Sequence, residues 1–150
     1  MFEIPHFKFG SDPITKCNIP PFITNLTGIT NAMVANAPKF FEIAKQVNEI
    51  LEDAIFVAHN VNFDYPIVKR EFQELGFDFK RKKLCTVRLS RKLIPNLPTY
   101  SLGALCASQN IEIKDRHRAR GDAAATVILF EQLMERDKGG IVFAAFLNGK

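Results

Sequence analysis

The chain has 150 residues, 47% of them hydrophobic and 24% charged, and a formal net charge of +4. This length fits one domain with a sizeable core, and the sequence predicts neither a membrane span of about 20 apolar residues nor a signal peptide. Its three cysteines, Cys17, Cys85 and Cys106, argue against a disulfide framework or a zinc site and predict a reducing, cytoplasmic compartment.

The N-terminal third predicts two helical turns and one longer helix. Two prolines open the first turn at 20–21 and Gly28 closes it, while Thr30 is a suitable N-cap for a second turn over 31–34. A longer helix is expected from Pro38, because apolar residues recur there at helical spacing. These residues are Phe40, Ile43, Ala44, Val47, Ile50 and Leu51.

The middle of the chain alternates strands with helices. A continuous apolar run over 54–58 predicts a buried strand, and a helix follows from about 62 to 75, where Gly76 stops it. A second strand is expected over 84–87, and the helical pattern resumes over 88–93. This alternation favours an α/β domain.

The last third predicts two further helices. Two prolines bound a loop, after which Thr99 or Ser101 caps a helix over 102–109. The final helix spans 121–135 and ends before two consecutive glycines.

Two segments each place a histidine five residues before an aspartate: His59 before Asp64, and His117 before Asp122. Both aspartates fall in the first turn of a predicted helix, and the first follows a predicted strand. A single aspartate there is usually explained by the helix dipole, but active sites of open α/β sheets lie beyond strand ends. Two carboxylates for a hard cation, with a histidine to take a proton from water, suit metal-assisted phosphodiester hydrolysis.

Positive charge is concentrated in residues 69–120, which hold 13 Lys/Arg against 5 Asp/Glu. The remaining residues hold 7 against 11. Such a stretch can follow a phosphate backbone, although a solvated charged surface explains it equally simply.

Four ordered segments resemble the DEDDh, or DnaQ-like, 3′–5′ exonucleases, typified by the proofreading epsilon subunit of bacterial DNA polymerase III. Residues 19–40 resemble the segment before the family's second motif, and residues 100–105 resemble the helix start before the third. The second motif is carried by His59-Asn60-x-x-Phe63-Asp64 and the third by His117-Arg118-Ala119-x-x-Asp122-Ala123.

The resemblance covers residues 18–136 and implies an RNase H-like fold, a mixed sheet flanked by helices. It identifies residues 1–138 as an exonuclease-like domain, followed by a tail over 139–150 that could link to further sequence. It also implies that Asp122 and Asp64 ligate Mg²⁺ or Mn²⁺ and that His117 is the general base. The partners implied are single-stranded nucleic acid and a DNA polymerase subunit, with no membrane.

Residues that contact the nucleic acid are assigned from the same resemblance and from the basic stretch. They are Thr27, His59, Asn60, Phe63, Lys82, Lys83, Arg88 and Arg118.

The family's first motif, an Asp-x-Glu on the first strand, is not found. Glu3 keeps the glutamate spacing and is the candidate for a further metal ligand, but Met1 stands where the aspartate should be. Only some 18 residues precede Ile19, so the N-terminal part of the sheet is expected to be shortened or incomplete. With two carboxylates, a two-metal site should bind its cations weakly.

These features leave three functions open. The first is a metal-dependent 3′–5′ exonuclease on single-stranded DNA or RNA ends, of the proofreading or repair type and impaired in this chain. The second is a degenerate, non-catalytic module that binds nucleic acid or docks on a polymerase. A small-molecule phosphatase or nucleotidase is the third, which the basic stretch and the lack of a glycine-rich phosphate loop disfavour.

Overall fold

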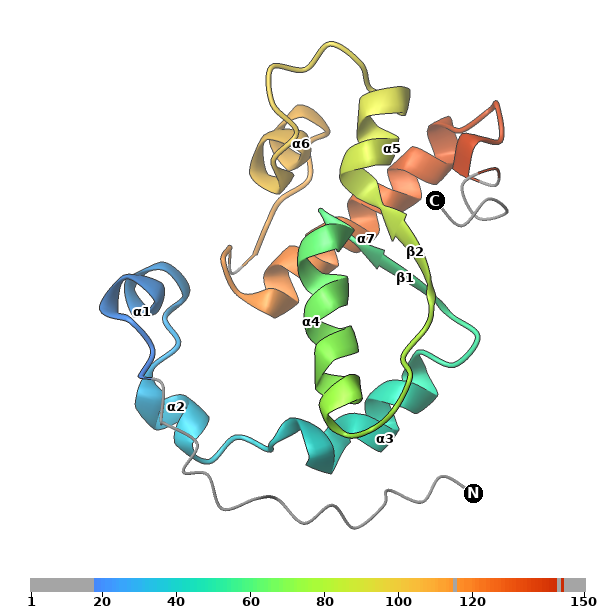
Figure 1. The fold of residues 1–150 in the computed structure, drawn as a ribbon. Helices are drawn as coiled ribbons and strands as arrows, with labels where there is room; N and C mark the ends of the chain where they lie inside the picture. The colour runs from blue at the N-terminus through green and yellow to red at the C-terminus, as the bar shows by residue number, and fades with distance from the viewer. Residues whose placement is uncertain (1–17, 115, 143, 145–150) are drawn as a thin grey trace.

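The computed structural model describes residues 18–114, 116–142 and 144 of the chain. In that part, helices surround a small parallel sheet (Figure 1). The elements in chain order are α1 (Pro21–Thr27), α2 (Asn31–Ala35), α3 (Phe40–Ile50), β1 (Ile55–Ala58), α4 (Val61–Glu74), β2 (Lys82–Cys85), α5 (Thr86–Leu93), α6 (Leu102–Ser108) and α7 (Ala119–Arg136). Within the described residues, no helix has the length and apolar character needed to cross a membrane.

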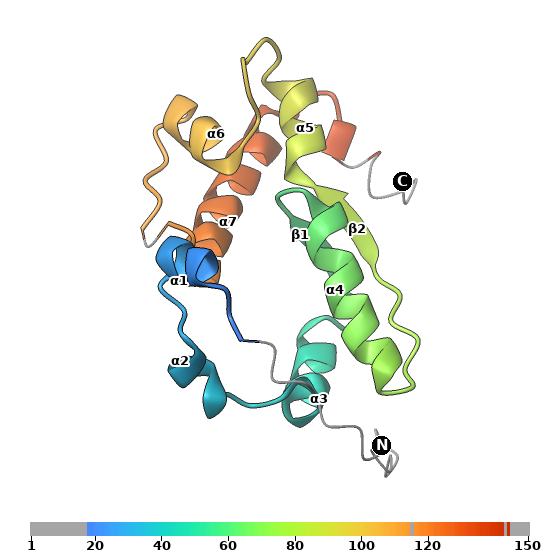
Figure 2. The same ribbon diagram turned by 60° about the vertical axis from the view of Figure 1, so that its left-hand side comes forward.

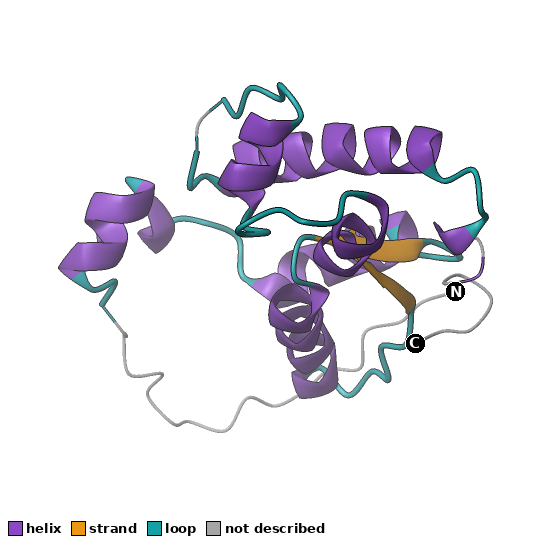
Figure 3. Cartoon of the chain, turned by 90° about the horizontal axis from the view of Figure 1, so that it is seen from above, coloured by secondary structure: helices purple, strands orange, loops and turns teal. Residues whose placement is uncertain are grey.

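The sheet sits between two hydrophobic clusters. Strands β1 and β2 pair in parallel, with Ile55 opposite Lys82 and Ala58 opposite Cys85. Because side chains alternate along a strand, Ile55 and Val57 pack against a cluster built on α5, α6 and α7, while Ala58 packs against one built on α3 and α4. Figure 3 shows the strands among these helices. The predicted α/β class is therefore confirmed for the described residues.

Most predicted helix ends are confirmed by their caps. Gly28 closes α1 in the left-handed conformation, with φ of 70°, and its N–H donates to the Thr24 carbonyl. The side chains of Thr30 and Ser101 accept hydrogen bonds from the first turns of α2 and α6, so Ser101 rather than Thr99 caps α6. Helix α4 runs over Val61–Glu74, close to the expected bounds.

Three predicted boundaries were wrong. Strand β2 begins at Lys82 rather than 84, because parallel pairing with β1 needs only backbone groups and leaves the lysine side chains exposed. Thr86 belongs to α5 rather than to the strand, and its buried hydroxyl meets His59. Helix α7 begins at Ala119, two residues early, because Gly121 is buried inside its first turn rather than breaking it.

Helices α1 and α2 form an arm to one side of the sheet (Figure 1). Neither helix contains a buried residue, and Phe22, Leu26, Met33 and Val34 are exposed. Figure 2 shows α1 beside the start of α7, where the Arg118 guanidinium lies 3.5 Å from the Gly28 carbonyl oxygen. The arm therefore reaches the body of the fold at the first turn of α7.

Candidate functional site

An open cleft of about 750 Å³ lies between the first turns of α4 and α7, beyond the carboxyl end of β1. Asp64 and Asp122, which were expected from the sequence to share a site, both line this cleft. The lining residues are Val57, Ala58, His59, Asn60, Phe63, Asp64, Leu102, Ala119, Asp122, Ala123, Thr126, Val127 and Phe130.

Local structure explains why both carboxylates face this space. Strand β1 ends at Ala58, and Asn60, with φ of 67°, turns the chain directly into α4. Asp64 and Asp122 then each occupy the first turn of their helix, where the positive end of the helix dipole stabilises negative charge. The fold thus presents two half-buried carboxylates at one end of the sheet.

The candidate base His117 lies outside the cleft lining in the described residues. It is exposed, with φ of 65°, and stands two residues before Ala119, which does line the cleft. Such a left-handed conformation is uncommon outside glycine, although Asn, Asp and His adopt it more often than other residues.

His59 lines the cleft, but both of its ring nitrogens are already bonded. Its Nε2 lies 3.0 Å from the Tyr100 carbonyl oxygen and its Nδ1 lies 2.9 Å from the Thr86 hydroxyl oxygen. Because a carbonyl only accepts, the neutral ring donates from Nε2 and accepts the Thr86 hydroxyl at Nδ1. His59 is thus engaged in the protein rather than free to donate to a nucleic acid.

Burial lowers the pKa of His59 from 6.5, against the smaller opposing effects of the Tyr100 carbonyl and the Asp64 charge. The unfolded chain therefore binds this proton at higher pH than the folded one, and unfolding free energy should fall as pH drops below 6.5. One such group contributes at most about 1.4 kcal/mol per pH unit. Urea unfolding at several pH values should show that the unfolding free energy of His59→Gln depends less steeply on pH than that of the wild type. Parallel profiles for the two proteins would contradict a lowered pKa of His59.

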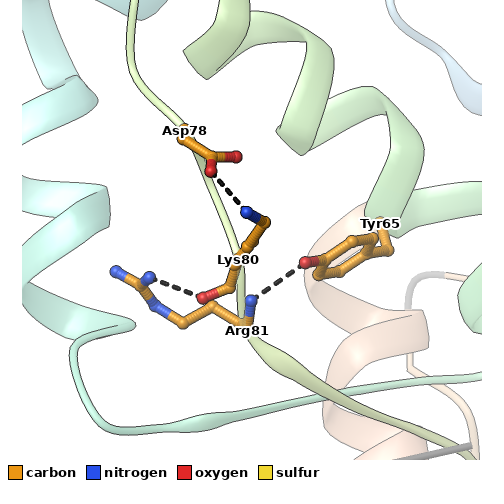
Figure 4. A network of polar contacts seen from close by, with 4 residues as sticks. All are labelled: Tyr65, Asp78, Lys80 and Arg81. Carbon is orange, nitrogen blue, oxygen red and sulfur yellow. Dashed lines mark hydrogen bonds and ion pairs between the residues drawn. The ribbon is translucent and has the colours of Figure 1, made fainter.

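The basic run over 80–83 is mostly engaged within the protein. Lys80 Nζ lies 2.7 Å from Asp78, and Lys83 Nζ lies 4.7 Å from the centre of the Tyr65 ring. Figure 4 shows the Asp78–Lys80 pair and the Arg81 backbone N–H donating to the Tyr65 hydroxyl at 2.9 Å.

Arg81 fastens the end of α3 to β2. Its guanidinium donates to the Leu51 carbonyl at 2.6 Å and to Asn48 Oδ1 at 2.8 Å, and lies 4.9 Å from the centre of the Phe79 ring. The last carbonyls of a helix need such donors, and a cation there is favoured by the dipole. Within the described residues, Lys82 is the member of the run whose side chain makes no ion pair, hydrogen bond or cation–π contact.

Arg81→Lys is expected to destabilise the fold by about 1–3 kcal/mol, because an ammonium cannot replace a planar fork that donates to two acceptors. The control is Lys82→Ser, an exposed neighbour whose loss should change stability by less than about 0.5 kcal/mol. Urea unfolding measures both changes. Equal effects of the two substitutions would show that the Arg81 contacts contribute nothing.

The other residues assigned to nucleic acid are spread over the fold. Lys82 opposes the first residue of β1, so it lies about 10 Å along the strand from the cleft end, and Lys83 is its neighbour. Thr27 uses its hydroxyl within the end of α1, donating to Ile23 and accepting from Ile29. Arg88 is exposed on α5. Of the assigned set, His59, Asn60 and Phe63 line the cleft.

The wall that α7 gives the cleft was not predicted from the sequence. Thr126 and Phe130 follow Asp122 at spacings of four and eight, and Val127 follows Ala123 at a spacing of four, so two adjacent rows of α7 side chains line the cleft. Val127 and Phe63 remain more than half exposed, at 56% and 67%. The helical spacing of Thr126 and Phe130 from Asp122 could have indicated in the sequence that they line the same site.

The carboxylates suit one hard divalent cation better than two. Mg²⁺ is commonly held by one or two carboxylates with several waters, and Asp64 and Asp122 can supply that set. In the described part of the chain, no group of three or more His, Cys, Asp or Glu side chains could hold a metal ion. Glu3, the further candidate ligand, lies outside the described residues.

Behind the cleft, the Cys106 thiol is buried and the structure gives it no metal-binding role. Burial raises the pKa of Cys106, and the charge of Asp122 raises it further, so the thiol stays protonated and unreactive.

Comparison with protein families gives one match over most of the chain. The model of a family described as an exonuclease, RNase_T, matches residues 2–130. This range contains the cleft and every residue assigned to it.

Several curated bacterial proteins are similar to the chain, each named 3′-5′ exonuclease DinG. That of Staphylococcus haemolyticus (strain JCSC1435) is 42% identical over 127 residues, covering 79% of this chain and 14% of the relative. The protein of Bacillus subtilis (strain 168) is 39% identical over 120 residues, covering 79% of this chain and 13% of the relative. The chain thus spans about a seventh of these proteins.

Proposed function

Because the chain belongs to the RNase_T exonuclease family, we propose that it is a metal-dependent 3′–5′ exonuclease acting on single-stranded DNA or RNA ends. The observation that carries the proposal is the convergence of Asp64 and Asp122 on one cleft. The α/β arrangement described above agrees with part of an RNase H-like fold.

In this proposal, Asp64 and Asp122 hold a Mg²⁺ or Mn²⁺ ion between the first turns of α4 and α7. When bound, such an ion polarises the phosphoryl group and makes a coordinated water more acidic. His117 takes the proton of the attacking water, after the loop before Ala119 brings it to the cleft. Apo geometry does not exclude this role, because catalytic hydrogen bonds often form only with substrate bound.

The cleft offers contacts for a terminal nucleotide. The exposed Phe63 ring can stack on a base, and Asn60 lies at the turn beside it. Arg88 and Arg118 lie on α5 and at the start of α7, from where they can attract the phosphate backbone. Lys82 and Lys83, at the other end of β1, are proposed to contact a longer strand.

With two carboxylates in the described part of the cleft, the chain is expected to hydrolyse nucleic acid slowly. Two cations need more anionic ligands than Asp64 and Asp122 provide, so a second metal would depend on Glu3 or another ligand outside the described residues. If turnover is absent while nucleic acid still binds, the second function applies, a non-catalytic module that binds nucleic acid or docks on a polymerase.

The test is degradation of single-stranded DNA labelled at its 3′ or 5′ end, with and without Mn²⁺. We expect slow, Mn²⁺-dependent release of mononucleotides from the 3′ end. Release that starts at the 5′ end, or that needs no metal, would contradict the proposed function. Rapid release would show that the site is more complete than the described carboxylates indicate, and Glu3→Gln would then test the further ligand.

The domain bounds and the cellular compartment of this activity are also proposed. Residues 1–138 are taken as the exonuclease domain, in a chain that spans a small part of its DinG relatives. Cys85 and Cys106 are free thiols, which agrees with a reducing, cytoplasmic compartment.

A further inference from the structure

The strongest feature outside the proposed chemistry is the set of contacts that holds His59. This residue follows the last residue of β1 and precedes Asn60, from which α4 begins. Its ring bridges two other elements: Thr86, the first residue of α5, and the carbonyl of Tyr100, just before α6. The turn into α4, the start of α5 and the segment before α6 are therefore joined through one side chain that lines the cleft.

Both anchors of this bridge are fixed in turn. Thr86 is fully buried. The last residues of the two strands, Ala58 and Cys85, are paired, so His59 and Thr86, which follow them, start from neighbouring positions. The Tyr100 hydroxyl donates to the Ile94 carbonyl at 2.9 Å and accepts from the Leu97 N–H at 3.4 Å. The His59 ring thus rests on positions with little freedom to move.

We infer that the Thr86–His59–Tyr100 hydrogen bonds position Asp64 in the cleft by fixing the turn from β1 into α4. His59 is a positioning residue in this view, since the fold itself occupies both of its ring nitrogens. The expected effect on metal binding rests on the proposed function, because Asp64 is the proposed metal ligand.

The chain of effects is short. Asn60 alone separates His59 from Val61, the first residue of α4, and it is held in the left-handed conformation. Asp64 follows within the first turn, so a small rotation of the turn displaces its carboxylate relative to Asp122. Removing the Thr86 hydroxyl leaves Nδ1 of a half-buried ring without its donor, which favours such a rotation.

The test compares Thr86→Val, which keeps the shape and removes the hydroxyl, with Thr86→Ser, which keeps the hydroxyl. Calorimetric titration of the full chain with Mn²⁺, well below its melting temperature, measures the site. Outer partners of metal ligands typically affect metal affinity by about 10–100-fold, so Thr86→Val should weaken Mn²⁺ binding by about tenfold. Thr86→Ser should stay close to wild type.

A control separates positioning from general destabilisation. Ile111→Val removes a buried methylene from the core, lowering stability without touching this bridge. Weaker Mn²⁺ binding in Thr86→Val but not in Ile111→Val supports the inference. Equal binding in Thr86→Val and wild type, or equal weakening in Thr86→Val and Ile111→Val, overturns it.

Hydrogen exchange makes the result independent of the metal. Amides of residues 60–65 should exchange faster in Thr86→Val than in Ile111→Val if the bridge fixes the turn, and equal rates would overturn the inference. Loss of Mn²⁺ binding in Asp64→Asn and Asp122→Asn tests the proposed function separately. A wild-type chain that binds no Mn²⁺ would remove the proposed function, and exchange over 60–65 would still decide whether the bridge fixes the turn.

Discussion

Asp122→Asn is expected to reduce Mn²⁺-dependent nucleotide release by at least about 10²-fold while the fold survives. Within the described residues, the Asp122 carboxylate makes no hydrogen bond or ion pair. Its backbone N–H donates to the Arg118 carbonyl, and its backbone carbonyl accepts from the Thr126 hydroxyl. The substitution therefore removes a charge from the cleft without removing a structural contact. Initial rates of 3′-label release, with unfolding curves for each variant, measure the two effects separately.

Asp53→Asn is the matched control for this substitution. It makes the same chemical change at an exposed position with φ of 53°, a conformation that Asn adopts readily. Full activity in Asp53→Asn together with the loss in Asp122→Asn would locate the effect in the cleft. An Asp122→Asn variant that keeps its rate would exclude Asp122 as a ligand.

His117→Asn is expected to slow turnover by about 10²–10⁴-fold, the usual contribution of a general base, with little change in affinity for single-stranded DNA. Asn suits the positive φ of this position, whereas His117→Ala would add backbone strain to the loss of the base. The measurement is the rate against pH, in this chain or in a version that carries the family's Asp-x-Glu motif. The variant should lose the rise in rate with pH that a general base produces.

A structural His117 would give a different result. Its replacement would lower the melting temperature and leave the rate per folded molecule nearly intact. That outcome would assign His117 to the start of α7 and leave the proposed reaction without its base.

Features set by local sequence could be predicted. The positions of β1 and α4 followed from a short apolar run and from helical spacing closed by Gly76. Two aspartates at helix starts, one directly after a strand, were enough to expect a shared site, and both line one cleft. The caps of α1, α2 and α6 depend on neighbouring residues, which the sequence shows directly.

Features set by distant partners could not be predicted. His59 was assigned to nucleic acid, yet its ring makes hydrogen bonds to Thr86 and Tyr100, which lie 27 and 41 positions later in the chain. Arg81 was grouped with a basic surface, yet its guanidinium caps a helix about 30 positions earlier. In both cases the side chain type allowed either role, and only the fold decides which acceptor it reaches.

The most direct test of the shared site is a Mn²⁺ titration of the wild-type chain beside the double variant Asp64→Asn, Asp122→Asn. If the two carboxylates hold one cation across the cleft, the wild type will bind one Mn²⁺ per chain and the double variant will bind none at the same concentrations. Equal Mn²⁺ binding by both proteins would contradict this, and would place any metal chemistry elsewhere in the chain.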